Sequence, residues 1–207
     1  MEEGSEKDCR QTTQTTSRMS KPIVLDLETK HSFREVNNDL TLLGVTCVGI
    51  YNYADDSYYA YMEGEIPKAL RVIEAASFTI GFNIDHFDFP VLNPYYTADL
   101  SKLPTIDLLT EFKNSLGKRV SLDSIAMATL GIGKSGHGLQ AIEFYREGKL
   151  EELKRYCLDD VKITKDLYDY GIAHNEVFIS NWQGKLSVKV DWGKKQVSSQ
   201  VNLTLGI

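Results

Sequence analysis

Short apolar runs, each bounded by polar or turn-forming residues, recur through the first half of the chain. Runs of this length, rich in β-branched and aromatic residues, predict strands rather than helices. The Asp55-Asp56 pair between the second and third runs fits a hairpin turn. We therefore expect five strands, at residues 23–29, 42–53, 57–62, 77–82 and 105–109.

Helical patterns separate some of these runs and predominate after about residue 120. Residues 68–76 have helical composition, and residues 121–130 are amphipathic between a candidate N-cap, Ser121, and a stop at Gly131. The longest helical candidate covers residues 150–170. Its apolar stripe consists of Leu153, Tyr156, Cys157, Asp160, Ile163, Thr164 and Leu167. A stripe that includes a tyrosine and an aspartate is not an ordinary core face.

The two ends of the chain differ from this middle part. Residues 1–20 are polar and aperiodic, which predicts a disordered leader. Alternation returns near residue 174, so we expect a domain over residues 21–173 and a β-hairpin extension over residues 174–207. The lysines of the extension fit either contact with a phosphate backbone or protection of an edge strand. They are Lys185, Lys189, Lys194 and Lys195.

Composition sets limits on location and partners. An apolar fraction of 42% and a charged fraction of 25% are typical of a globular protein, and no apolar run is long enough for a membrane span or a signal peptide. The three cysteines have no metal-ligand spacing, which favours reduced thiols and a cytoplasmic location. The net charge of −6 argues against a nucleic-acid partner unless bound cations offset it.

Acidic residues supply the candidate chemistry. Asp26 and Glu28 share one face of the first strand, because side chains on a strand alternate. Asp88 follows the fourth strand, where open α/β sheets place ligands. Asp160 shares a helix face with Tyr156, whereas Asp159 lies about 100° away and should face solvent. Convergent carboxylates suit Mg²⁺ or Mn²⁺, and two such cations would reduce the net charge to about −2.

Three segments resemble the motifs of a known nuclease class. They are Leu25-Asp26-Leu27-Glu28-Thr29, Asn83-x3-Phe87-Asp88-x-Pro90-x-Leu92 and Tyr156-Cys-Leu-Asp-Asp160. In this order and spacing they are similar to the DEDDy-class 3′–5′ exonucleases of the ribonuclease H-like superfamily, above all the proofreading domain of family B DNA polymerases and its stand-alone relatives. The resemblance covers about residues 22–170 and implies an α/β fold, a mixed five-stranded sheet flanked by helices.

The resemblance also implies roles for individual residues. Asp26, Glu28 and Asp160 would hold a first divalent cation, and Asp26 and Asp88 a second, with Asp88 acting directly or through water. Tyr156 would orient the attacking water; a histidine in that role is disfavoured because position 155 is arginine. The substrate-binding candidates are Thr29, Asn83, Phe87 and Lys134. For Phe87 a core position is an open alternative, as is a solvent-exposed position for Asp85, His86, Lys134 and His137.

Taken together, these features predict a metal-dependent 3′–5′ exonuclease acting on single-stranded nucleic acid with a free 3′ end, DNA rather than RNA. A catalytically idle binding or scaffold subunit is the main alternative, which the presence of all five motif residues disfavours. An endonuclease of the same fold is a second alternative, disfavoured by Tyr156. The glycine-rich residues 131–138 lack the full phosphate-loop pattern. With no polymerase domain in the sequence, we expect a free-standing enzyme or a subunit whose specificity comes from a protein partner.

Overall fold

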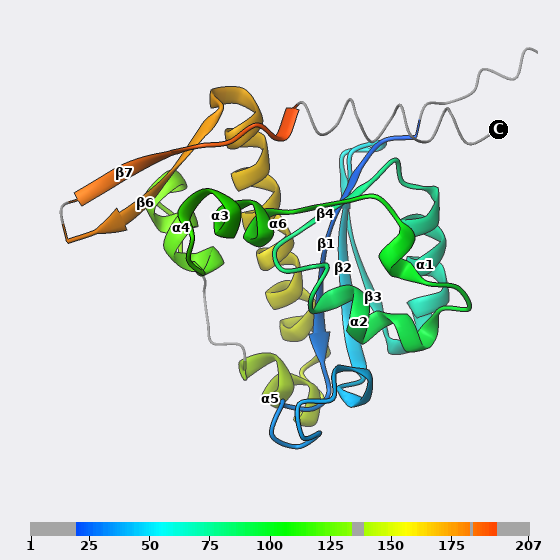
Figure 1. The fold of residues 1–207 in the computed structure, drawn as a ribbon. Coiled ribbons are helices and arrows are strands. Elements are labelled where there is room, and N and C mark those ends of the chain that lie inside the picture. The colour runs from blue at the N-terminus through cyan, green and yellow to red at the C-terminus, as the bar shows by residue number, and fades with distance from the viewer. Residues whose placement is uncertain (1–19, 134–138, 183, 194–207) are drawn as a thin grey trace, which may run out of the picture.

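The computed structural model describes residues 20–133, 139–182 and 184–193 (Figure 1). The predicted leader, Lys134, His137, Lys194 and Lys195 fall outside these residues. The strands are β1 (Ile23–Thr29), β2 (Val45–Asn52), β3 (Ser57–Met62), β4 (Thr79–Gly81), β5 (Thr105–Asp107), β6 (Glu176–Asn181) and β7 (Gly184–Lys189). The α-helices are α1 (Ile66–Ala75), α2 (Asp88–Leu92), α3 (Leu108–Leu116), α4 (Leu122–Leu130), α5 (Gln140–Arg146) and α6 (Leu150–His174).

Strands β1 to β5 form one mixed sheet, in the order β3-β2-β1-β4-β5. The first three strands are antiparallel, while β4 and β5 run parallel to β1. Helices α1 and α2 cover one face, and α3, α4 and α6 cover the other (Figure 1). The predicted mixed five-stranded sheet flanked by helices, with a C-terminal hairpin, is therefore confirmed.

Local capping explains where several elements begin and end. The Ser121 hydroxyl accepts a hydrogen bond from the Ser124 N–H at the start of α4, and Gly131 ends this helix in the left-handed conformation, as the sequence predicts. The second strand begins later than expected, at Val45, because residues 40–42 form a 3₁₀ turn capped by Asp39. The fifth strand ends at Asp107, because the Asp107 carboxylate caps a helix, α3, that the sequence analysis did not predict.

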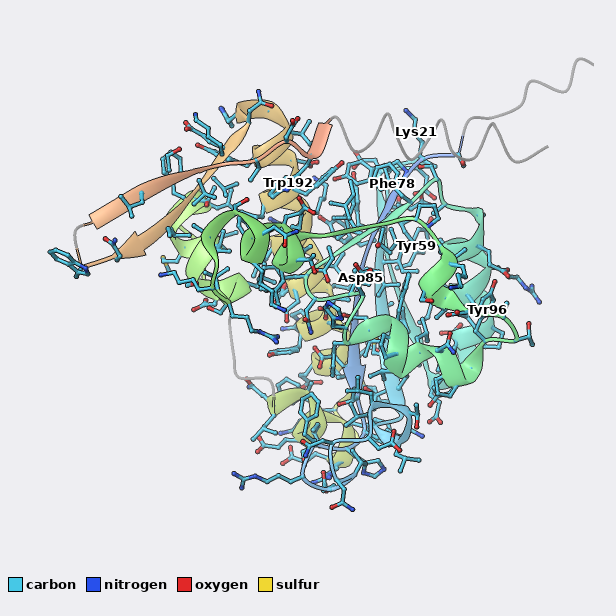
Figure 2. The ribbon with its side chains drawn as sticks, viewed as in Figure 1. Lys21, Tyr59, Phe78, Asp85, Tyr96 and Trp192 are labelled. Carbon is cyan, nitrogen blue, oxygen red and sulfur yellow. The ribbon has the colours of Figure 1, made fainter. Side chains whose placement is uncertain are left out.

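The C-terminal hairpin of β6 and β7 packs its apolar side against the helices on one face of the sheet, α3, α4 and α6. Val177 and Val188 belong to the same apolar cluster as residues of α4 and α6. Just beyond β7, the Trp192 side chain (labelled in Figure 2) stacks on Tyr168 of α6, with ring centroids 5.8 Å apart. A Cβ atom at Gly171 would lie only 2.0 Å from the Trp192 ring. The absence of a side chain at Gly171 therefore creates the space that this indole fills.

Among the described residues, no helix combines the length and the apolar character that a membrane crossing requires.

Candidate active site

Three of the predicted acids come together at the contact between β1 and α6. Carboxylate oxygens of Asp26, Glu28 and Asp160 all lie within 4.8 Å of one another. Glu28 and Asp160 are buried, and Asp26 is half-buried. Carboxylates this close repel one another when ionised, and partial burial raises that cost. A bound divalent cation would relieve the repulsion, and oxygen ligands suit Mg²⁺ or Mn²⁺.

The pairing of β1 with β2 changes register within this site. Glu28 is opposite Cys47, but the next residue, Thr29, is opposite Val45. This slip leaves one extra residue on β2, as in a β-bulge, a feature that frequently redirects side chains beside active sites. It occurs directly after the two acids of β1.

Close approach of α6 to the sheet depends on a glycine in β2. Gly49 is opposite Asp26, and a Cβ atom there would lie 2.8 Å from both the Cys157 sulfur and a Val161 methyl group. The side chain of Cys157, one residue after Tyr156, fills the space above Gly49, with its sulfur 3.6 Å from the Asp26 carbonyl oxygen. A hydrogen bond to Cys47 and burial raise the pKa of the Cys157 thiol, so this group stays neutral beside the acids.

Replacing Gly49 with alanine should therefore destabilise the protein. The added methyl group must push α6 away from β2, and overpacking of this kind commonly costs about 1–3 kcal/mol. Chemical denaturation of Gly49→Ala would measure the loss. Gly64→Ala is the matched control, because a Cβ atom at Gly64 meets no other atom within 4 Å. Equal stability of the two variants would show that α6 does not depend on this contact.

Asp88, the fourth predicted acid, lies apart from the group of three. It is buried at the start of α2, and its Oδ1 accepts a hydrogen bond of 3.1 Å from the Leu27 N–H. Leu27 separates Asp26 from Glu28, so this bond fixes the segment of β1 that carries both. The structure thus gives Asp88 a role in positioning β1, in addition to the metal-binding role that the resemblance implies.

A cavity of about 410 Å³ opens beside the three acids. Tyr156, Thr29 and Phe87 line it, as predicted for residues near the reacting groups. Tyr156 is buried and contacts the Phe144 ring edge-to-face, with centroids 6.4 Å apart. Phe87 is half-buried and packs against Phe33 at 5.7 Å, so it belongs to both the core and the cavity.

Part of the cavity wall was missed by sequence reasoning. It comes from the turn after β1, which supplies His31, Ser32 and Phe33, and from Leu139 and Ile142 at α5. Glu35 accepts hydrogen bonds from the backbone and hydroxyl of Ser32, and ion-pairs with Arg146 of α5. These contacts, led by the Ser32 backbone N–H, lower the pKa of Glu35 to about 2. The hydrogen bonds and the ion pair of Glu35 thus connect the turn after β1 to α5.

Asn83, the remaining predicted substrate residue that the structure describes, lies just beyond β4 and does not line the cavity. Asn83 follows this strand in the left-handed conformation, with φ of 75°, which asparagine tolerates better than most residues. Its N–H donates to the Asp107 carboxylate at 2.8 Å, and its side-chain oxygen lies 3.5 Å from the Arg119 guanidinium. Asp85 accepts a hydrogen bond from the Thr105 hydroxyl, and both Asp85 and His86 are exposed. Neither residue lines the cavity.

The structure bears on two predictions about the surface, the solvent exposure of Asp159 and the role of the hairpin lysines. Asp159 is half-buried rather than fully exposed to solvent, although it is absent from the group of three acids. In the hairpin, Lys189 pairs with Glu176 at 2.8 Å, and Lys185 lies over the Phe178 ring. These internal contacts favour the edge-strand interpretation of the two lysines over contact with phosphate.

Comparison with known protein families identifies the domain that carries these acids. Residues 23–172 match the family described as the RNase H superfamily, over a span that includes the whole sheet and nearly all of α6. The chain belongs to the RNase H superfamily. No curated protein matches the sequence closely enough to count as a relative.

A solved structure shares the fold of this RNase H superfamily chain. It is the family B DNA polymerase from the hyperthermophilic archaeon Pyrobaculum calidifontis, with a TM-score of 0.56 and 17% sequence identity. The likeness covers 73% of this chain but only 24% of the polymerase chain. At this identity the comparison supports the fold alone, and most of the polymerase has no counterpart here.

Proposed function

We propose that this RNase H superfamily chain is a metal-dependent 3′–5′ exonuclease of the DEDDy class. Its substrate is single-stranded nucleic acid with a free 3′ end. The observation that carries the proposal is the convergence of Asp26, Glu28 and Asp160 beside Tyr156 in one cavity. The resemblance of the three motifs to those of the proofreading domain of DNA polymerases favours DNA over RNA as the substrate.

The three acids fit the role of holding a divalent cation. Each contributes a carboxylate oxygen within 4.8 Å of the others. Because the group offers only oxygen ligands, it suits a hard cation such as Mg²⁺ rather than zinc. Asp26, the most exposed of the three, would also reach a second cation, with Asp88 contributing directly or through water. Cations bound there supply a more acidic water molecule and stabilise the leaving oxygen of a phosphodiester.

The chain's own residues orient the reactants. The Tyr156 hydroxyl would hold the attacking water by a hydrogen bond, in a position set by the contact of its ring with Phe144. Phe33 and Phe87 offer aromatic surfaces on which a terminal base can stack, a contact that tolerates any base sequence. Together these groups position a strand end against the acids.

Metal binding provides a test that does not depend on the substrate. Mg²⁺ or Mn²⁺ should raise the thermal midpoint of the wild type. At about 100 times its Kd, the bound ion should add about 2.7 kcal/mol to the free energy of unfolding. Asp26→Ala should lose most of this increase, because it removes a ligand that the remaining acids cannot replace. Differential scanning fluorimetry with and without the ion measures both.

A control separates this effect from a general change in charge. Glu152→Ala removes an exposed carboxylate from the first turn of α6 and should retain the metal-dependent increase. If Asp26→Ala kept the full increase, the ions would bind elsewhere and the proposed metal site would be wrong.

A further inference from the structure

Figure 1 shows the short loop between α3 and α4. It carries two adjacent exposed cations, Lys118 and Arg119. Arg119 reaches the end of β4, where its Nη2 lies 3.5 Å from the side-chain oxygen of Asn83. Asn83 is one of the predicted substrate residues. The cationic loop therefore contacts one predicted substrate residue, which lies outside the cavity that holds the acids.

Neither cation is neutralised by an acid within the described ranges. Across residues 20–133, 139–182 and 184–193, no carboxylate oxygen lies within 4.0 Å of the Lys118 ammonium or the Arg119 guanidinium. Many other described cations do have such a partner: Lys30, Lys68, Lys102, Arg146, Lys149, Lys154, Lys162, Lys165 and Lys189. In a chain with a net charge of −6, this pair leaves positive charge available for an external anion.

The ends of the loop are fixed by the helices that it joins. Gly117 ends α3 in the left-handed conformation, and its N–H donates to the Lys113 carbonyl oxygen. At the other end, the Ser121 hydroxyl caps α4. The two cations are therefore held within a turn of only a few residues, rather than on a long mobile segment.

The Asp107 carboxylate fixes the start of α3, the helix that leads into this loop, beside the segment that follows β4. It accepts hydrogen bonds from the backbone of Asn83 and from the first turn of α3, at Leu109 and Thr110. Because β1, β4 and β5 are parallel, their carboxyl ends meet at one edge of the sheet. Along this edge the acids of β1 come first, then Asn83 after β4, and then α3 with its cationic loop.

We propose that Lys118 and Arg119 bind backbone phosphates of the substrate strand, on the 5′ side of the bond that is cleaved. This inference rests on the proposed function and extends it from the strand end to the strand behind it. Phosphates are repelled by the acids of the site and by the net charge, so a cationic contact beyond Asn83 supplies attraction where the strand leaves the cavity. The contact is independent of base sequence.

Salt dependence of binding tests this role directly. A fluorescein-labelled oligothymidylate of about 20 nucleotides is titrated with the full chain in EDTA, where no cleavage occurs, over a range of salt concentrations. Each phosphate contact on a single strand contributes about 0.7 to the slope of log K against log salt, so Lys118→Gln/Arg119→Gln should reduce its magnitude by about 1.4. At about 0.1 M salt, affinity should fall by about tenfold or more.

Two controls isolate the position of the charge. Lys68→Gln/Lys102→Gln removes the same amount of charge from two exposed lysines that pair with Glu65 and Asp99, and should leave the slope unchanged. Arg119→Lys keeps a cation and should retain most of the slope. Equal slopes for the two double variants would overturn the proposal.

The binding measurement also separates this proposal from the proposed function. If the wild type degrades the strand but Lys118→Gln/Arg119→Gln does not change the slope, the nuclease assignment stands and the loop does not bind phosphate. If the wild type binds the strand without cleaving it, and the variant reduces the slope, the loop binds phosphate but the nuclease assignment is wrong. Failure of the wild type to bind the oligothymidylate would overturn the role of the loop.

Discussion

Asp160→Asn is expected to lower kcat by about 100-fold or more, because it removes a charged ligand from a group of three acids that act together. Its neighbour provides the matched control. Asp159→Asn makes the same chemical change one residue earlier, on a different face of α6, and should stay within about threefold of the wild type. Steady-state rates of strand degradation in Mg²⁺ measure both variants.

The order of the two aspartates is the informative result. Asp160 is 6% exposed and belongs to the acid group, whereas Asp159 is half-buried outside it. A larger loss of kcat in Asp159→Asn than in Asp160→Asn would mean that the face of α6 with Asp159, not the face with Asp160, points toward the metal. The third motif would then be wrong, and with it the assignment of Tyr156.

Tyr156→Phe should also reduce kcat strongly, by about 10²-fold, because a group that orients the attacking water acts on the rate of the chemical step. The phenyl ring keeps the contact with Phe144, so the fold and the three acids should stay in place. Metal-dependent stabilisation should therefore remain close to that of the wild type. Rate and thermal midpoint are measured on the same preparation.

This pattern differs from that of a metal ligand, for which activity and metal-dependent stabilisation fall together. Phe144→Leu is a useful companion variant, because it weakens the packing of the Tyr156 ring while leaving the hydroxyl present. It should give a smaller loss of kcat than Tyr156→Phe. Full activity in Tyr156→Phe would mean that another group positions the water.

Much of the fold followed from local signals in the sequence. The third strand has the predicted bounds, residues 57–62, in a run with three tyrosines, and α4 has the predicted Ser121 cap and Gly131 stop. The stripe on α6 is buried as expected, which is why Asp160 and Tyr156 could be placed together before the structure was known. Strong periodicity and strong caps are properties of short stretches, so the sequence alone reveals them.

Features that depend on contacts between distant segments did not follow in the same way. The apolar run at residues 105–109 predicts a strand throughout, but the strand ends at Asp107, where the Asp107 carboxylate caps the first turn of α3. The cavity wall combines Phe33 with α5, two segments more than 100 residues apart in the sequence. No local pattern links them.

One missed residue did leave a signal. Gly49 is an isolated glycine inside an otherwise apolar strand, a pattern that indicates a bulge or a close approach of another segment. The structure shows the close approach, from Cys157 and Val161 of α6. By contrast, the hydrogen bond from the Leu27 N–H to Asp88 connects residues that are 61 positions apart, and the sequence gives no indication of it.

Degradation of end-labelled strands tests the central claim most directly. Single-stranded DNA and RNA, labelled at either the 5′ or the 3′ end, are incubated with the full chain in Mg²⁺, Mn²⁺ or EDTA. With Mg²⁺ or Mn²⁺, we expect 5′-labelled DNA to give a ladder that shortens from the 3′ end, and 3′-labelled DNA to release its label as a mononucleotide. RNA should react more slowly, and EDTA should stop the reaction. Internal cuts, a ladder that shortens from the 5′ end, or intact strands with every metal would contradict a 3′–5′ exonuclease.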